Sequence, residues 1–137
     1  MTFYHGCEKV SATSIQSTTS PSNVNVGLGN GEMGQGFYVG DNLTLAISWA
    51  KGRFGATASV LEFDVNNTKY ASLSFRRLSA SSVVRTWTQY KRLKKNILFG
   101  SDIVFGPFAT IPFAAQYKFE SLNAETVINH SPISKIL

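Results

Sequence analysis

The chain has 137 residues, of which 43% are hydrophobic and 15% charged, and its formal net charge is +5. This length predicts one domain spanning residues 1–137, and the composition excludes a disordered chain. No run approaches eighteen uninterrupted apolar residues, and the first residues lack the basic and apolar regions of a secretion signal. We therefore expect no membrane partner and a cytoplasmic location, in the producing cell or in a target cell.

In chain order, the sequence predicts strands over residues 2–5, 36–39, 58–65, 70–75, 102–108 and 114–120, and helices over 9–17, 43–50, 82–96 and 121–128. A long loop precedes the strand at 36, and a tail of low structure follows residue 128. The segment 58–65 alternates apolar and polar residues with the period of a strand. Asp41 or Asn42 is suited to cap the helix from 43, and Lys51-Gly52 is a stop signal. Strands outnumber helices without regular β-α-β alternation, which predicts an α+β fold.

The helix predicted over 82–96 is amphipathic and strongly basic. Its predicted apolar face comprises Val83, Val84, Trp87, Tyr90 and Leu93. Between residues 76 and 95 the chain has no acid and seven cations: Arg76, Arg77, Arg85, Lys91, Arg92, Lys94 and Lys95. Such a block favours an anionic partner, which would be a dinucleotide phosphate, a nucleic acid or an acidic protein.

Metal and thiol chemistry find little support in the sequence. Cys7 is the only cysteine and there are only two histidines, so an internal disulfide and Cys-rich zinc sites are excluded. No orienting partner for a nucleophilic Cys7 is recognisable, so we predict a buried or half-buried thiol. We expect no metal cofactor.

Two short motifs carry most of the functional information. The first is Phe3-Tyr4-His5-Gly6, and the second is the segment Gly34-Gln35-Gly36-Phe37-Tyr38-Val39, which leads into a helix containing Trp49. The glycines of the second motif precede a strand and are not followed by Lys and Ser or Thr. Both phosphate-binding loops and dinucleotide fingerprints of the Gly-x-Gly-x-x-Gly type are therefore excluded.

In this order, the motifs resemble those of the ADP-ribosyltransferase superfamily, which includes poly(ADP-ribose) polymerases and diphtheria-type toxins with the His-Tyr pattern. The similarity is closest to small bacterial members, which share a later Asp-x-Val-x-Gly-Pro and a Gln-x-x-Phe near the end. Here these are the segments 102–107 and 116–119. The resemblance implies a split, strongly bent antiparallel sheet with a few short helices, and NAD as substrate.

The resemblance also implies roles for individual residues in NAD binding. His5 would hydrogen-bond a ribose hydroxyl, Gly6 would let the backbone pair with the nicotinamide carboxamide, and Gly36 belongs to the second motif. Tyr38 and Trp49 would flank the nicotinamide, although most relatives have Tyr at the position of Trp49. Aromatic faces suit this flat cationic ring, which they attract by about 0.5–2 kcal/mol.

Cleavage of the nicotinamide–ribose bond develops positive charge on the ribose, which a carboxylate or polar group stabilises. Many relatives use a Glu on a late strand, whereas the matching position here is Gln116. Gln116, Lys118 and Glu120 share one face of the predicted strand. Gln116 and Glu120 are therefore the candidate catalytic residues.

The resulting hypothesis is an enzyme that transfers ADP-ribose from NAD to a protein or nucleic-acid acceptor. A bacterial toxin or effector is one such protein, and a cognate inhibitor protein would then be a partner. Hydrolysis of NAD and a non-catalytic module that binds NAD, ADP-ribose or a partner are alternatives within the same fold. A nucleic-acid-binding protein driven by the basic segment is a further alternative, although no known motif of that class is present.

Overall fold

The computed structural model describes residues 1–16, 21–93, 97–111 and 113–137. The chain forms two compact units. Unit 1 comprises Met1–Val24, Val39–Ala71 and Thr126–Leu137, and unit 2 comprises Asn25–Tyr38 and Ser72–Glu125. Both units contain strands and helices. Among the described residues, the strand pairings within unit 1 are antiparallel, and those within unit 2 are antiparallel apart from one parallel pair. The predicted α+β class is confirmed in this general sense.

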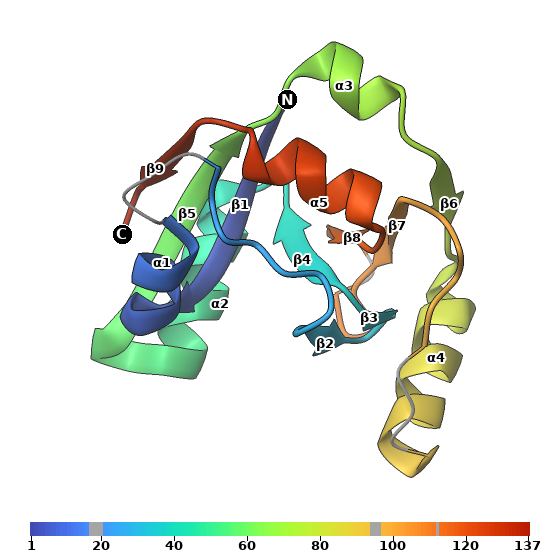
Figure 1. The fold of residues 1–137 in the computed structure, drawn as a ribbon. Helices are drawn as coiled ribbons and strands as arrows, with labels where there is room; N and C mark the ends of the chain where they lie inside the picture. The colour runs from blue at the N-terminus through green and yellow to red at the C-terminus, as the bar shows by residue number, and fades with distance from the viewer. Residues whose placement is uncertain (17–20, 94–96, 112) are drawn as a thin grey trace. The chain divides into compact units, whose positions relative to one another are not determined.

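Unit 1 contains the second half of β4 (Phe37–Gly40), followed across the sheet by β1 (Thr2–Glu8), β5 (Ala58–Asp64) and β9 (Ile133–Lys135), as Figure 1 shows. The strands predicted near residues 2–5 and 58–65 are confirmed, and β1 continues three residues beyond His5. The prediction of a tail with little structure is wrong, because Ile133 pairs with Phe63 and the tail extends the sheet.

Unit 1 also contains α1 (Lys9–Gln16), α2 (Leu43–Phe54), a single 3₁₀ turn (Gly55–Thr57) and α3 (Asn67–Ala71). Asn42 caps α2, since its side chain accepts a hydrogen bond from the Leu45 amide at 3.0 Å. The predicted end at Lys51-Gly52 is wrong. The helix continues to Phe54, and Gly55 ends it at a φ of 58° that side chains rarely adopt.

The strand predicted over residues 70–75 is also wrong. The Asn66 side chain accepts a hydrogen bond from the Lys69 amide at 2.9 Å, and its carbonyl accepts one from the Tyr70 amide. This local cap starts α3 in place of a strand. Tyr70 is buried, and its ring lies 5.3 Å from that of Phe3. Only Phe75–Arg77 forms a strand, β6.

Two layers of side chains surround β1 and β5 in unit 1. Ala50 of α2 packs with Ala58 and Val60 of β5, and these three side chains are buried. The alternate residues Leu61 and Phe63 point to the other face and are also buried. In Figure 1, α1 lies in front of these strands and α2 behind them.

The strands β6, β7 (Ile103–Pro107) and β8 (Ala115–Phe119) lie side by side in unit 2, with β6 parallel to β7 and β8 antiparallel to it. The two predicted strands near 102–108 and 114–120 are therefore confirmed. Unit 2 also has a short hairpin of β2 (Asn30–Gly31) and β3 (Gly34–Gln35), within and directly after the segment predicted as a loop. The helix α5 (Leu122–Asn129) begins after Ser121, which caps it as predicted through a 3.0 Å hydrogen bond from the Ala124 amide.

The basic helix is α4 (Ala80–Leu93), and it begins two residues earlier than predicted. The Ser79 hydroxyl accepts a hydrogen bond from the Ser82 amide at 3.2 Å, which fixes the first turn. Of its predicted apolar face, Val83 is buried in the core of unit 2, but Val84 and Leu93 are exposed. The last predicted helical residues, 94–96, lie outside the described residues.

Candidate functional site

His5 and Gly6 lie in the middle of β1, where they pair with Leu61 and Val60 of β5. His5 is half-buried. A Cβ atom at Gly6 would lie 3.0 Å from Cε3 of Trp49 and 3.1 Å from the Ala46 carbonyl oxygen. Glycine therefore favours the close packing of α2 on β1, since a side chain here would have to push these neighbours back by a few tenths of an ångström. This packing preference exists whether or not Gly6 also binds a ligand.

Trp49 lies on α2 beside Gly6 and is 50% exposed, which is unusual for so large an apolar side chain. The Arg53 guanidinium carbon lies 5.7 Å from the centre of the Trp49 ring. These two residues are one helical turn apart, so they share a face of α2. Unit 1 thus presents an exposed aromatic ring and a cation next to the His5-Gly6 segment.

The strands that carry the two motifs are neighbours. β4 follows directly from the Gly34-Gln35-Gly36 segment, and its Gly40 pairs with Tyr4 of β1 in antiparallel register. About thirty residues separate these strands in the sequence.

Tyr38 is held by its hydroxyl group within unit 2. This hydroxyl donates a hydrogen bond to the Gly34 carbonyl at 2.5 Å and accepts one from the Met33 amide at 2.9 Å. Gly31 lies against the ring, because a Cβ there would come within 2.7 Å of Cζ. Burial raises the pKa of the Tyr38 phenol far above its usual range, although the bond from Met33 opposes this. Tyr38 thus fastens the β2–β3 hairpin as a neutral phenol.

Gly36 is buried beneath the side chain of Lys118 on β8. A Cβ atom at Gly36 would lie 2.6 Å from Cδ of Lys118 and 3.0 Å from the Phe119 carbonyl oxygen. The glycine that the resemblance singles out is thus needed for packing inside unit 2.

Gln116 is 4% exposed, and its amide group points inward. Nε2 donates hydrogen bonds to Oε1 of Glu32 at 2.9 Å and to the Pro107 carbonyl at 3.2 Å. The same Glu32 oxygen accepts a 2.9 Å hydrogen bond from the Ala109 amide. Glu32 is half-buried. Gln116 and the Ala109 amide therefore hold a carboxylate that the sequence analysis did not identify.

Glu120 is buried, and its carboxylate is bound from several sides. It accepts hydrogen bonds from the Phe99 amide at 3.0 Å and the Gly100 amide at 2.8 Å, and it forms a 2.5 Å ion pair with Lys118. Nζ of Lys118 also donates to the Met33 carbonyl at 2.6 Å. Burial lowers the pKa of Lys118, although Glu120 raises it in part. These contacts give Glu120 an evident structural role.

Asp102 and Gly106, from the later part of the resemblance, have structural roles as well. The Asp102 carboxylate accepts hydrogen bonds from the Ser74 amide at 2.8 Å and from the Ser121 hydroxyl at 2.5 Å. Burial raises the pKa of this carboxyl, but the hydrogen bonds outweigh that effect and lower it. A Cβ at Gly106 would lie 2.9 Å from the Leu78 carbonyl oxygen.

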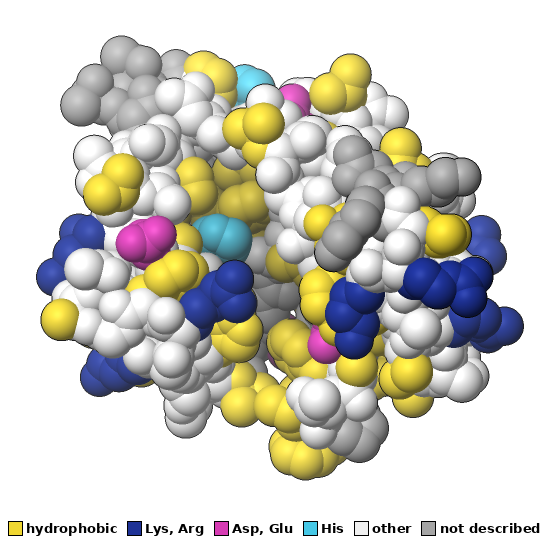
Figure 2. Space-filling view, turned by 90° about the horizontal axis from the view of Figure 1, so that it is seen from below, with side chains coloured by type: hydrophobic (Ala, Val, Ile, Leu, Met, Phe, Trp, Pro, Cys, Tyr) yellow, Lys and Arg dark blue, Asp and Glu magenta, His cyan; other side chains and the backbone are white. Residues whose placement is uncertain are grey.

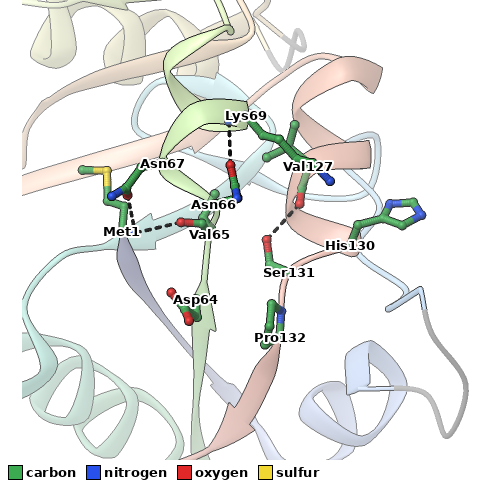
Figure 3. A pocket seen from close by; sticks show the side chains of 10 residues that line it. All are labelled: Met1, Asp64, Val65, Asn66, Asn67, Lys69, Val127, His130, Ser131 and Pro132. Carbon is green, nitrogen blue, oxygen red and sulfur yellow. Dashed lines mark hydrogen bonds between the residues drawn. The ribbon is translucent and has the colours of Figure 1, made fainter.

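A cavity of about 320 Å³ lies in unit 1, away from every predicted site residue of that unit. Its lining includes Asp64 from the end of β5, Lys69 from α3, and His130 after α5, whose imidazole points away from the other lining side chains in Figure 3. Nδ1 of His130 lies 2.8 Å from the Thr126 carbonyl oxygen. None of the sequence motifs contributes to this cavity.

Cys7 is buried as predicted, and burial raises the pKa of its thiol to about 11. In the described parts of the chain, no three His, Cys, Asp or Glu residues are grouped so that they could hold a metal ion. Within those same parts, the structure contains no helix with the length and apolar character needed to cross a membrane.

Comparisons with protein-family models and with curated proteins find no match to this chain. Sequence reasoning missed two residues that the geometry brings forward, Glu32 and Arg53. A signal existed for each: Glu32 is the only acid in the glycine-rich segment before Gly34, and Arg53 follows Trp49 at helical spacing.

Proposed function

We propose that this protein binds NAD through an ADP-ribosyltransferase-like fold and transfers ADP-ribose to a macromolecular acceptor. The observation that carries the proposal is the pairing of Tyr4 with Gly40, which makes neighbours of the strands bearing the two motifs. These two strands are about thirty residues apart in the sequence, and their pairing within unit 1 supports the proposal.

In unit 1, we assign recognition of NAD to Gly6, Trp49 and Arg53 on the α2 side of β1 and to His5, whose side chain points to the opposite face of the strand. The half-buried His5 supplies a ring nitrogen for a ribose hydroxyl, and the half-exposed Trp49 supplies an aromatic face. Arg53, which lies over that ring, supplies a cation for the pyrophosphate. Gly36 and Tyr38 support the second motif from within unit 2, where Tyr38 fixes the hairpin that contains Glu32.

Within unit 2, the Glu32 carboxylate joins Gln116 and Glu120 as a candidate for the group that stabilises positive charge on the ribose, because Gln116 and the Ala109 amide hold it in place. Where Glu32 takes this role, Gln116 is a positioning residue, because both hydrogens of its amide nitrogen are used to hold Glu32 and the Pro107 carbonyl. The Glu120 carboxylate is already bound by two backbone amides and Lys118.

Release of labelled nicotinamide from NAD tests the role of Glu32. We expect Glu32→Gln to lower the release rate about 10²–10³-fold, the usual effect of losing one electrostatic contact to the transition state, while NAD binding is retained. Glu62→Gln is the matched control, because Glu62 is a half-buried carboxylate on β5, and it should release nicotinamide at the rate of the unaltered chain. Unchanged release by Glu32→Gln would contradict the role of Glu32.

A second candidate function is a non-catalytic module that binds NAD or ADP-ribose. The inward hydrogen bonds of Gln116 and the bound carboxylate of Glu120 favour it, because the expected catalytic groups are occupied. This alternative predicts NAD binding that depends on His5, with no nicotinamide release by the unaltered chain even in the presence of cell extract. ADP-ribose found by mass spectrometry on components of that extract would exclude it.

A further inference from the structure

A basic face on unit 2 plays no part in the proposed NAD chemistry. We define the β6–α4 face by five exposed cations, which are Arg76 and Arg77 of β6 and Arg85, Lys91 and Arg92 of α4. Figure 2 shows Lys and Arg side chains gathered at the right of the view, the side on which Figure 1 places β6 and α4. Residues 65–101 contain no acid that could neutralise them locally.

The acids of unit 2 are all engaged elsewhere. Glu32 binds the Ala109 amide, Asp102 binds Ser74 and Ser121, Glu120 pairs with Lys118, and Glu125 accepts a 2.9 Å hydrogen bond from the Val26 amide. No described ion pair therefore joins any of these four acids to the β6–α4 face. A cluster of one sign of charge raises the local concentration of anionic partners.

Aromatic rings accompany the cations on α4. The rings of Trp87 and Tyr90 are stacked, with centres 5.6 Å apart and planes 14° apart, and Nζ of Lys91 lies 5.5 Å from the Trp87 ring centre. Both rings are half-buried, so each keeps an accessible part. Arg76 likewise lies 5.3 Å from the Phe99 ring centre. Cations interleaved with aromatic rings are what single-stranded nucleic acids bind, through their phosphates and bases respectively.

The orientation of α4 argues against an anionic membrane surface as the partner. Val83 and Thr86 are buried in unit 2, and the exposed Val84 and Leu93 are nine residues apart, on opposite sides of the helix, so α4 presents no single apolar face to lipids. Arg85 and Arg92 are two helical turns apart, about 10 Å along the axis, and both point to solvent. An extended chain with regularly repeated charges matches this spacing.

We propose that the β6–α4 face binds single-stranded nucleic acid, with its five cations on phosphates and with bases stacking at Trp87 and Tyr90. The proposal is independent of NAD chemistry. Five phosphate contacts give a slope of log affinity against log salt of about −3.5 for a single strand. Affinity should therefore fall about 100-fold between 50 and 200 mM salt.

Fluorescence anisotropy with labelled 12-nucleotide single strands of RNA and of DNA, in mixed sequence, tests this. The variant Arg85→Gln/Lys91→Gln/Arg92→Gln should bind weakly, with a slope of about −1.4. The charge-matched control Lys9→Gln/Lys51→Gln/Lys135→Gln removes three exposed cations of unit 1 and should bind as the unaltered chain does. The proposal is supported if RNA or DNA binds the unaltered chain and the unit 1 variant with equal affinity and binds the α4 variant weakly.

Tryptophan fluorescence gives a second readout that does not depend on the triple variants. The chain has two tryptophans, so Trp49→Phe leaves Trp87 as the only one. Its emission should be quenched by the single strands, whereas emission from Trp49 in the Trp87→Phe variant should not change. Absence of binding at 50 mM salt, equal losses in both triple variants, or binding to phosphatidylserine vesicles in place of the oligonucleotides would each overturn the proposal.

Discussion

The buried pair of Lys118 and Glu120 allows the sharpest test of the structural reasoning. The Lys118 side chain is 0% exposed and the Glu120 side chain 5%. Replacing Lys118 by Met keeps most of its aliphatic volume but removes the ammonium group, and with it the bonds to the Met33 carbonyl and to Glu120. The Glu120 charge then stays buried with only the Phe99 and Gly100 amides as described partners.

Breaking a buried pair by removing one partner costs about 3–5 kcal/mol. For a chain of this length, we expect Lys118→Met to lower the melting temperature by about 10–20 °C. Glu120→Gln should also destabilise, because it leaves the ammonium without its counter-charge. In the double variant, the two losses should be less than additive by about 1–3 kcal/mol. Thermal unfolding followed by circular dichroism measures all three, and a loss below about 1 kcal/mol in either single variant would refute this reasoning.

Three further predictions concern single side chains. Tyr38→Phe keeps the ring but loses both hydroxyl bonds of the hairpin, so denaturant unfolding should show a loss of about 1–3 kcal/mol. Folding raises the pKa of Cys7 to about 11, so the neutral thiol stabilises the folded state fully below about pH 9. This contribution to the free energy of unfolding is lost as the pH rises from 9 to 11. Alkylation of this thiol at pH 8 should accordingly proceed only when the protein unfolds. Rapid alkylation of the folded protein would contradict the burial of Cys7. Asn42→Ala should lower the free energy of unfolding by about 1 kcal/mol, because α2 loses its cap. An unfolding midpoint equal to that of the unaltered chain would contradict this.

Elements with a strong local signal could be predicted from the sequence. The alternation over 58–65 gave β5, and the capping residues Asn42 and Ser121 gave the starts of α2 and α5. Elements that depend on distant partners could not be predicted. β9 forms because Ile133 pairs with Phe63 of β5, and no periodicity in the sequence of the tail predicts this pairing. The error at 70–75 arose because the Asn66 cap outweighed the strand preference of the following residues.

The candidate site was predictable only in part, for a similar reason. The motifs identify residue types, but their order in the sequence did not predict that β1 pairs with β4. The role of each carboxylate depends on contacts between residues far apart in the sequence, such as that of Gln116 with Glu32, which are 84 residues apart. Such contacts cannot be read from the motifs. Strand alternation correctly placed Gln116, Lys118 and Glu120 on one face. It could not show that this face is occupied by an ion pair.

Titration of the purified chain with NAD tests the central claim most directly. The chain has two histidines in unit 1, so His130→Ala is a matched control for His5→Ala, and it also reports on the unit 1 cavity. We predict one bound NAD per chain, with affinity unchanged by His130→Ala and reduced at least about tenfold by His5→Ala, as expected for a lost ligand hydrogen bond of about 1.4 kcal/mol. No binding at millimolar NAD, or equal affinity of the His5→Ala variant and the unaltered chain, would contradict the account.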